Sequence, residues 1–304
     1  MDRTLDLSIV IVNYNVCGLL RNCLESLFHS QGYLTFEVIV VDNKSDDGSA
    51  EMVRTMFPQV LTIESPINGG YAYANNLALT QIIRRDKSCW PRYVLLLNPD
   101  TVVPSGALEE MVSFMDAHQE AGAAGPKLVR QNGGLDLACR RSFPSPEVSL
   151  YRMLGLSKLF PRSRRFARYN LTYLSPDGVY EVDSVVGAFM LVRVAALAQV
   201  GLLDEDFFMY GEDLDWAYRF KEKGWKVLYN GRVEVIHYKG ESSKQESIKP
   251  IFEFYRAMLV FYRKHYYEST AAPINLLIIS AIVLRGAFAV TQNVLRYKTR
   301  SVFQ

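Results

Sequence analysis

Six carboxylates and four aromatic side chains fall within the segment 204–216 of this 304-residue chain. Acids at this density would repel one another on a plain surface, and the interleaved aromatic side chains favour the wall of a cleft. Glu212 and Asp213 fall in the expected first turn of a helix, where the macrodipole favours an ionised carboxylate. Either side chain could then accept a hydroxyl proton as a general base. A solvated helix start is the alternative interpretation.

Two further acids follow apolar runs that are typical of buried strands. Asp42 comes directly after Val38–Val41, where its carboxylate could bind a nucleobase or ribose, or could equally cap the next helix. Asp100 ends Asn98-Pro99-Asp100, after the run Tyr93–Leu97. An acid there can hold Mg²⁺ or Mn²⁺, which take oxygen ligands and are commonly completed by substrate phosphates. A plain Asn-Pro-Asp turn is the alternative.

His237 ends the strand-like run Val233–Ile236. A lone histidine is more often structural than a metal ligand, so this residue by itself leaves both roles open. The chain contains no HExxH, GxGxxG or P-loop motif, which excludes zinc-protease, dinucleotide and Walker-type sites. The net charge of +2 gives no indication that the chain binds nucleic acid.

Strands and helices alternate through the first 120 residues. Continuous aliphatic runs require burial on both faces, which predicts an α/β fold with a mostly parallel sheet flanked by helices. Ligands of such sheets bind at the carboxyl ends of the strands, and these ends are polar here. The expected strands are Ser8–Asn13, Phe36–Asp42, Val60–Glu64 and Tyr93–Leu97, and the expected helices are 17–30, 48–57, 71–86 and 105–119.

From about residue 180 the pattern becomes mixed, with strands expected at Val182–Val186, Phe189–Arg193 and 226–236 and a helix at 212–223. The tail, 246–304, is expected to form a helical extension. Its apolar run Ile274–Leu284 is shorter than the roughly 20 residues that span a bilayer. Docking at a membrane surface, packing on the main domain and spanning a membrane therefore all stay open for the tail.

The composition, with 49% apolar and 22% charged residues, is that of an ordinary globular protein. Cys17, Cys23, Cys89 and Cys139 have no CxxC spacing, and we expect free thiols in a reducing cytosol. The N-terminus has no signal-peptide pattern, so we expect a cytoplasmic protein. Residues 151–170 carry six cations and no acid. They form either a solvated loop or a surface that contacts a lipid diphosphate or an anionic membrane. The cations in 272–300 would also suit contact with an anionic membrane.

Together these segments resemble the family 2 glycosyltransferases of the GT-A fold, especially their rhamnosyltransferase-like branch. The resemblance covers about residues 7–242, with seven motifs in the order of the family. The motifs are Ser8–Asn15, Val40–Asn43, Asn68–Asn76, Leu96–Asp100, Gly187–Arg193, Phe208–Asp213 and His237.

The resemblance implies a role for each matching residue. Asp42 would contact the nucleotide base, with Asn13 and Asn15 on the bordering loop, while Gly70 and Asn75 would lie near the sugar nucleotide. Asn98-Pro99-Asp100 stands where the family has Asp-x-Asp. Asn98 replaces the first acid at this donor site, so Asp100 alone of the motif would bind the metal.

The same resemblance assigns the remaining chemistry to the second half of the chain. His237 would be the second metal ligand. Asp213 matches the acid of the family's Glu-Asp element and would be the catalytic base, with Glu212 as its neighbour or as the second choice.

The resemblance also implies a GT-A domain over 1–245, with a donor half of about 1–130 and an acceptor half of about 131–245. The implied reaction is inverting and uses Mg²⁺ or Mn²⁺. It moves a sugar, L-rhamnose from dTDP-L-rhamnose first of all, to a glycan or lipid-linked saccharide. The implied setting is cell-envelope polysaccharide synthesis at the inner face of the cell membrane.

Two other classes of protein are alternatives to a glycosyltransferase. A sugar nucleotidyltransferase would need a glycine-rich loop with Arg or Lys after the first strand, and this chain has Asn13–Cys17 there. An inactive binding module with a similar fold would not need Asp42, Asp100, Asp213 and His237.

Overall fold

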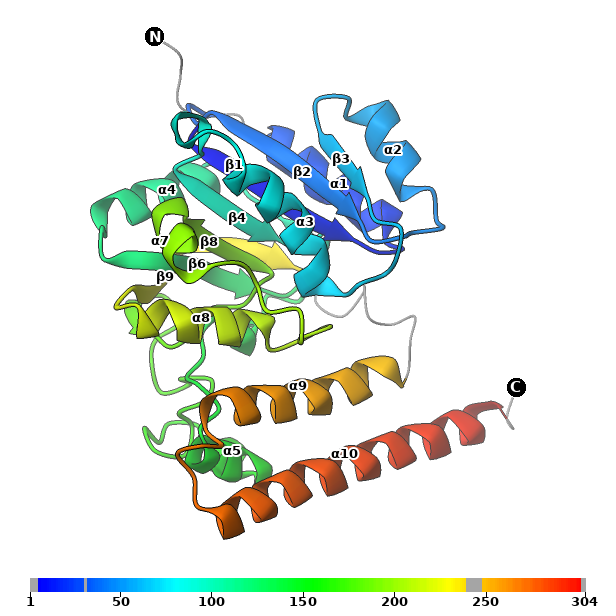
Figure 1. Cartoon of the computed structure of the whole chain (residues 1–304), viewed down its shortest axis with the longest axis vertical. Helices are drawn as coiled ribbons and strands as arrows, with labels where there is room; N and C mark the ends of the chain where they lie inside the picture. The colour runs from blue at the N-terminus through cyan, green and yellow to red at the C-terminus, as the bar shows by residue number, and fades with distance from the viewer. Residues whose placement is uncertain (1–4, 30–31, 239–247, 302–304) are drawn as a thin grey trace.

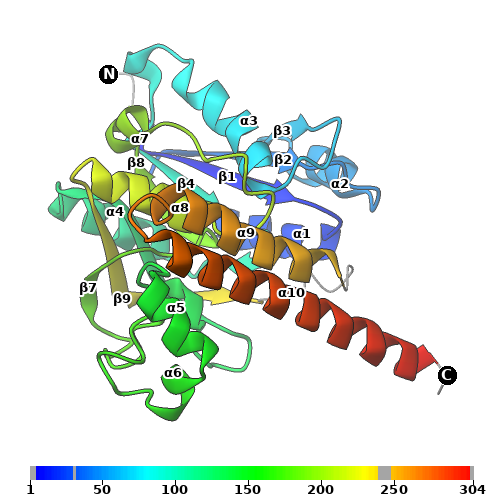
Figure 2. The ribbon, with the colours of Figure 1, turned by 60° about the horizontal axis from the view of Figure 1, so that its bottom comes forward.

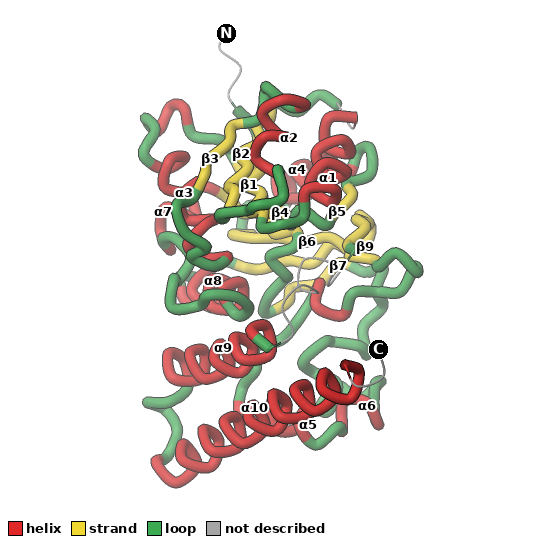
Figure 3. Tube along the Cα trace, turned by 90° about the vertical axis from the view of Figure 1, so that its right-hand side faces the viewer, coloured by secondary structure: helices red, strands yellow, loops and turns green. Residues whose placement is uncertain are grey.

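The computed structural model of the chain describes residues 5–29, 32–238 and 248–301, with side chains up to residue 294. A single nine-stranded sheet in the order β3-β2-β1-β4-β8-β6-β9-β5, with β7 paired to β9, runs through the molecule (Figure 1). Helices cover both faces of this sheet. Figure 3 shows α3 and α7 on one side, with α1 and α4 on the other. The predicted α/β class with flanking helices is therefore confirmed.

The first half of the sheet is parallel, as the apolar runs predict. Its strands pair in register along β1–β2, β1–β4 and β2–β3, and the three central strands are almost wholly buried, which is the reason for their continuous aliphatic composition. The strands are β1 (Leu7–Asn13), β2 (Phe36–Asp42), β3 (Leu61–Glu64) and β4 (Tyr93–Leu97), and the helices are α1 (Cys17–His29), α2 (Ser49–Met56), α3 (Tyr71–Ile83) and α4 (Ala107–Ala117).

The second half continues the same sheet with mixed pairing. β8 joins β4 in antiparallel register, and β6 and β9 extend the sheet beyond it. The strands are β5 (Thr101–Val102), β6 (Ala121–Val129), β7 (Val179–Val182), β8 (Phe189–Arg193) and β9 (Lys226–His237); the helices are α5 (Pro146–Met153), α6 (Leu156–Leu159), α7 (Val194–Val200) and α8 (Glu212–Glu222), with 3₁₀ turns at Lys87–Cys89 and Leu137–Cys139.

One predicted strand, Val182–Val186, is wrong. The strand ends at Val182 because the backbone of Ser184 turns to pair with Arg141 in an isolated bridge. A second strand, β6, was not expected at all, since its first five residues are alanine and glycine. A Cβ atom at Gly125 would lie 2.8 Å from Val185, so the neighbouring segment demands a small residue there.

The tail forms a helical hairpin of α9 (Lys249–His265) and α10 (Ala272–Ser301). Figures 1 and 2 show α9 lying between α8 and α10. Phe207 and Leu214 of the α8 region pack with Ala257 and Phe261 of α9 in a separate apolar cluster. The expected boundary between the domain and the extension, at 245/246, lies outside the described residues.

The apolar stretch of the tail is longer than the run Ile274–Leu284 that the sequence indicated, and all three arrangements of the tail stay open. Among the described helices, α10 carries an apolar stretch of 23 residues, Ala272–Val294, which is long enough to cross a membrane. Arg285 interrupts the apolar sequence without ending it, because the run resumes at Gly286. The side chains of Arg296, Lys298 and Arg300 lie outside the described residues. The four cysteines are free thiols, as expected.

Candidate active site

The carboxyl ends of β1 and β2 lie side by side because the two strands pair in parallel, with Asn13 opposite Asp42. Asn13 Nδ2 donates to Asp42 Oδ2 at 3.1 Å and is also 3.1 Å from Ser45 Oγ. The backbone N–H of Ser45 donates to the other oxygen, Asp42 Oδ1, at 2.7 Å. The buried Asp42 carboxylate thus orders the turn after β2, whereas α2 begins at Gly48 without a side-chain cap.

Asn15 joins the loops that follow β1 and β2. Its Oδ1 accepts from Asp46 N at 2.8 Å, and its backbone N–H donates to Ser45 Oγ at 3.0 Å. The backbone of Asn15 is left-handed, with φ of 53°, a conformation that asparagine tolerates better than most residues. The two loops form one rigid rim at the predicted nucleotide-binding edge.

Gly70 sits where the donor half touches the loop before α8. Its backbone has φ of 89° and ψ of 178°, a region that only glycine adopts readily. A Cβ atom there would lie 2.3 Å from the carbonyl oxygen of Phe208, and the next residue, Tyr71, donates its N–H to that oxygen at 2.7 Å. On α3, Asn75 Nδ2 donates to Tyr71 O at 2.9 Å.

Asp100 and His237 meet because β5, directly after Asp100, pairs with the end of β9. His237 Nε2 is 3.3 Å from Asp100 Oδ1, and His237 Nδ1 is 3.1 Å from Asp136 Oδ2. Burial alone would lower the pKa of His237, but the hydrogen bonds with Asp100 and Asp136 outweigh it and raise this pKa to about 9. Both ring nitrogens of His237 therefore face a carboxylate.

The Asn-Pro-Asp segment is also a turn. The backbone oxygen of Asn98 accepts from Thr101 Oγ1 at 2.8 Å, and its N–H donates to Ala188 O at 3.0 Å. The turn therefore fixes the direction in which Asp100 leaves β4. The two interpretations of this motif are compatible, since the turn presents the acid.

The donor atoms of Asp100 and His237 fit a divalent ion. Their separation of 3.3 Å is close to the roughly 3 Å between neighbouring ligands of an octahedral ion with bonds of about 2.1 Å. Among the residues that the structure describes, no group of three His, Cys, Asp or Glu side chains could hold a metal by itself. The phosphates of a substrate could supply further oxygen ligands to an ion held here.

Asp213 is fixed by contacts from two distant segments and from the next residue. Its Oδ2 accepts from Arg141 at 2.7 Å and from Gly187 N at 3.0 Å, while its Oδ1 accepts from Leu214 N at 2.8 Å. Both Asp213 and Arg141 are buried. Burial alone would lower the pKa of Arg141, but the Asp213 carboxylate outweighs it, so the guanidinium keeps its charge. A carboxylate has about four lone-pair positions, so three contacts leave one for a further donor.

Glu212 is the less constrained of the two acids. It is 7% exposed, and its Oε2 accepts no hydrogen bond from the part of the chain that the structure describes. Burial, followed by the neighbouring Asp213 carboxylate, raises the pKa of Glu212 to about 8.

Tyr71 connects the predicted base to the predicted metal ligand. Burial raises the pKa of Tyr71, and the carboxylates of Glu212, Asp213 and Asp100 raise it further. The Tyr71 hydroxyl donates to Gly187 O at 2.9 Å, and the N–H of Gly187 donates to Asp213 Oδ2 at 3.0 Å. The carbonyl oxygen of the next residue, Ala188, accepts from Asn98 N at 3.0 Å, two residues before Asp100. The structure brings the two predicted centres into one neighbourhood.

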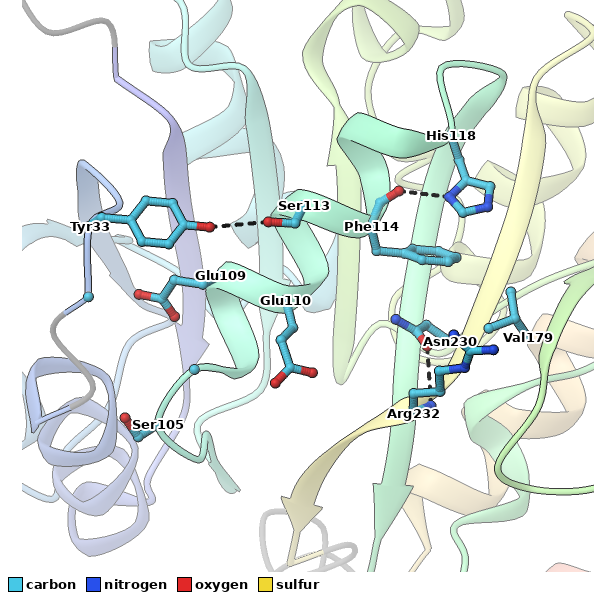
Figure 4. A pocket seen from close by; sticks show the side chains of 12 residues that line it. Tyr33, Ser105, Glu109, Glu110, Ser113, Phe114, His118, Val179, Asn230 and Arg232 are labelled. Atoms are coloured by element: carbon cyan, nitrogen blue, oxygen red, sulfur yellow. Dashed lines mark hydrogen bonds between the residues drawn. The ribbon is translucent and has the colours of Figure 1, made fainter.

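A separate pocket of about 800 Å³ lies along α4 (Figure 4). It is lined by Tyr33, Glu109, Glu110, His118 and Arg232, among others. The hydroxyl of Tyr33 is 3.1 Å from Ser113 Oγ across one side of it. The pocket contains none of the predicted site residues. We therefore place the candidate site at the carboxyl ends of the strands and not in this pocket.

Two residues of the site were missed from the sequence. Asp136 is fully buried and belongs to a short 3₁₀ turn, where its Oδ1 accepts from Ala138 N at 3.1 Å. Arg141 lies ten positions before the start of the basic cluster of 151–170, in a segment with no strand or helix pattern. The only signal was the pair Arg140-Arg141, and of these Arg140 packs over the Tyr229 ring instead.

Comparison with known proteins places this chain in a family. The model described as Glycosyl transferase family 2 matches residues 8–201, more than half of the chain. The chain belongs to this family, and the resemblance stated from its motifs is confirmed. The match ends before α8, so Glu212, Asp213 and His237 lie beyond it.

Similar proteins include rhamnosyltransferases. The chain is 27% identical over 270 residues to the N-acetylglucosaminyl-diphospho-decaprenol L-rhamnosyltransferase of Mycobacterium tuberculosis, covering 87% of each chain. It is 24% identical to the rhamnosyltransferase WbbL of Escherichia coli, covering 76% of this chain and 82% of that protein. These relatives span the α8 region that the family match leaves out.

A solved structure with a similar fold is the mannosyltransferase PcManGT of Pyrobaculum calidifontis in complex with GDP-Man and Mn²⁺. It has a TM-score of 0.58 at 16% identity, covering 99% of this chain and 76% of that one. The structure of GalNAc-T7 with UDP, GalNAc and Mn²⁺ has a TM-score of 0.57 at 14% identity, covering 86% and 50%. These two likenesses support the GT-A fold.

Proposed function

We propose that this glycosyltransferase moves L-rhamnose from dTDP-L-rhamnose to a hydroxyl group of a lipid-linked saccharide, with inversion at the anomeric carbon, in the synthesis of a cell-envelope polysaccharide. The rhamnosyltransferases that cover most of both chains support the donor and the acceptor. The observation that carries the proposed chemistry is the segment Gly187–Ala188, which binds Asp213 and Tyr71 through Gly187 and the Asn-Pro-Asp turn through Ala188. We further propose that the protein acts in the cytoplasm, at the inner face of the cell membrane.

The proposed reaction is a single displacement. The oxygen of the acceptor hydroxyl forms a bond to the anomeric carbon while the bond from that carbon to the nucleoside diphosphate breaks, and attack from the opposite face inverts the centre. Asp213 takes the acceptor proton, with Glu212 as the alternative base. General-base assistance of this kind contributes about 10² to 10⁴ in rate.

The remaining residues bind and orient. Asp42, Asn13 and Asn15 form the rigid rim that would hold the nucleotide, and Gly70, Asn75 and Asn98 border the sugar. Asp100 and His237 would hold Mg²⁺ or Mn²⁺, which when bound supplies positive charge to the diphosphate leaving group. The Arg141 guanidinium donates to Asp213 and holds its carboxylate in place.

Transfer assays with purified full-length protein test this function. The protein is incubated with Mn²⁺, a polyprenyl-diphosphate-linked N-acetylglucosamine acceptor, and dTDP-L-rhamnose, UDP-glucose or GDP-mannose in parallel. We expect product with dTDP-L-rhamnose, and a thermal shift with dTDP that Mn²⁺ enlarges. Product with another donor only would overturn the proposed sugar, and synthesis of a nucleotide sugar from a sugar 1-phosphate would point to a nucleotidyltransferase.

A further inference from the structure

Helix α10 has two apolar faces, and only one of them is covered. The covered face carries Ile282 and Gly286, both buried; a Cβ atom at Gly286 would lie 3.1 Å from the Tyr255 ring of α9. The opposite face is an exposed apolar stripe along the whole described helix. It consists of Leu276, Leu277, Val283, Leu284 and Phe288, each at least 51% exposed.

A second exposed apolar patch adjoins this stripe. On α5 and α6, Leu150, Leu154 and Leu159 are 51%, 64% and 69% exposed. α5 lies beside α10 in Figures 1, 2 and 3. Arg285 Nη1 donates to the carbonyl oxygen of Met153 at 3.2 Å and so links α10 to α5. The exposed Leu284 comes directly before Arg285, and the exposed Leu154 comes directly after Met153. Large exposed apolar patches on soluble proteins commonly mark sites of protein or membrane interaction.

Cations surround the patch on its α5–α6 side. Between Glu147 and Asp177 the sequence has no acidic residue, and α10 has none either. The exposed cations of the segment are Arg152, Lys158, Arg162, Arg164, Arg165 and Arg168. A second copy of the chain would bring an equally basic rim against this one, and like charges would oppose the contact. An anionic lipid surface has the complementary charge and an apolar layer beneath it.

Polar contacts fix the start of α10 to the end of α9 and to the turn between the two helices. The buried Asn275 Nδ2 donates to Tyr267 O at 3.0 Å and to Thr270 O at 2.9 Å, and the Tyr262 hydroxyl donates to Asn275 Oδ1. A helix that crossed a bilayer would have to leave α9 and carry Arg285 into the hydrocarbon. These contacts favour a helix that stays on the protein and lies flat in the interface.

We propose that α5, α6 and the exposed stripe of α10 form one docking surface for an anionic bilayer, with α10 parallel to the membrane plane. The surface deepens the proposed function, because α9 alone separates α10 from α8 and its catalytic acids. A saccharide carried on a lipid would then be presented beneath the site. The apolar stripe and the basic rim would bind a membrane whatever the acceptor is.

Vesicle flotation without any donor tests the surface. We expect the full-length protein to float with vesicles of phosphatidylcholine and phosphatidylglycerol, and much less with phosphatidylcholine alone. Arg162→Glu with Arg164→Glu should weaken binding at least tenfold, since each cation near an anionic surface contributes about fivefold. Arg130→Glu with Lys223→Glu is the matched control. Leu277→Ser with Leu284→Ser should also release the protein, whereas Met56→Ser should not.

Depth measurements separate the two membrane arrangements. Leu277→Trp and Phe288→Trp place a fluorophore at two points that are about 16 Å apart along the helix. In a flat helix, lipids brominated at one depth quench both variants equally. Unequal quenching would show a spanning helix and overturn the proposed orientation.

Two other outcomes would overturn the surface itself. One is binding that Leu277→Ser with Leu284→Ser leaves unchanged. The other is a dimer in lipid-free solution that the same variant dissociates, without vesicle binding. Vesicle binding without transfer to a lipid-linked acceptor would instead contradict the proposed function and leave the surface in place.

Discussion

The rim at the ends of β1 and β2 and the start of α8 fix their carboxylates in different ways. At the rim, Asp42 is held by residues of its own loop and of the adjacent parallel strand. At α8, Asp213 is held by Arg141, which lies 72 positions earlier, and by the backbone of Gly187. The first arrangement follows from strand pairing alone, whereas the second requires the whole acceptor half to fold around a buried ion pair.

This difference teaches where the molecule is sensitive. A change at the rim disturbs a loop that several short hydrogen bonds maintain. A change at Asp213 leaves the buried Arg141 without its carboxylate, and an uncompensated buried charge is costly, at about 3–5 kcal/mol when a pair is broken outright. We therefore expect chemistry and stability to be coupled at α8 and separable at the rim.

The largest effect is expected for Asp213→Asn. Loss of the base should lower the transfer rate by about 10² to 10⁴, and the protein should fold with a lower melting temperature because Arg141 loses a charged partner. Single-turnover transfer and thermal unfolding measure the two effects. Asp42→Asn should retain its melting temperature more closely, since no buried ion pair is broken at the rim.

Glu212→Gln is the control for the choice of base. Glu212 makes few contacts, so this variant should unfold near the wild-type temperature. If Glu212 were the base, kcat/KM would rise with pH toward about 8, where its carboxyl ionises, and this limb would vanish in the Gln variant. Near wild-type transfer by Asp213→Asn, together with that behaviour, would move the role to Glu212.

Gly70→Ala should produce the next largest effect, because the added methyl group would push residue 70 away from the loop before α8. The backbone conformation of Gly70 costs other residues about 1–3 kcal/mol, and the new Cβ would collide with the Phe208 carbonyl. Chemical denaturation should show a loss of about 3 kcal/mol, with weaker dTDP binding. Gly48→Ala, at φ of 81° with nothing near its Cβ, should lose only about 1 kcal/mol. Equal losses would mean that the Phe208 contact is unimportant.

Asp136→Asn tests a positioning role in the acceptor half of the molecule. A carboxylate behind a metal-binding histidine orients its ring, and removal of such a partner typically weakens metal binding 10–100-fold. Isothermal titration with Mn²⁺ and dTDP should show this loss, while unfolding in EDTA changes little. Asp177→Asn, an exposed acid paired with Lys127, is the matched control. A purely structural Asp136 would show the reverse pattern.

The smallest effect concerns acid stability at Asp215. Burial alone would raise the pKa of Asp215, but His265 and Arg219 outweigh it and lower this pKa. A lowered folded-state pKa contributes stability above the unfolded value of about 3.9, which is lost as the pH falls through the folded value. The unfolding free energy should therefore fall less steeply below about pH 4 in Asp215→Asn than in wild type. Equal slopes would contradict this account.

The sequence predicted the parallel half of the sheet closely, since β2 and β4 have the expected bounds. Apolar runs there are local signals of burial on both faces. It failed at β6, where glycine and alanine are dictated by neighbours such as Trp225 and Val185. The pairing of Asp100 with His237 was anticipated through resemblance to a family. Asp136 and Arg141 were not, because their partners lie about 100 and 72 positions away.

The position of α9 has a practical consequence for producing this protein. His265 on α9 bonds to Asp215 at 2.8 Å, and the same helix covers Phe207 and Leu214. A shortened version that stops near residue 245 would expose Phe207 and Leu214 to solvent. It would also leave the buried Asp215 without its partner His265. Such a fragment should aggregate on expression. Purification should instead retain the whole hairpin and use a mild detergent to shield α10.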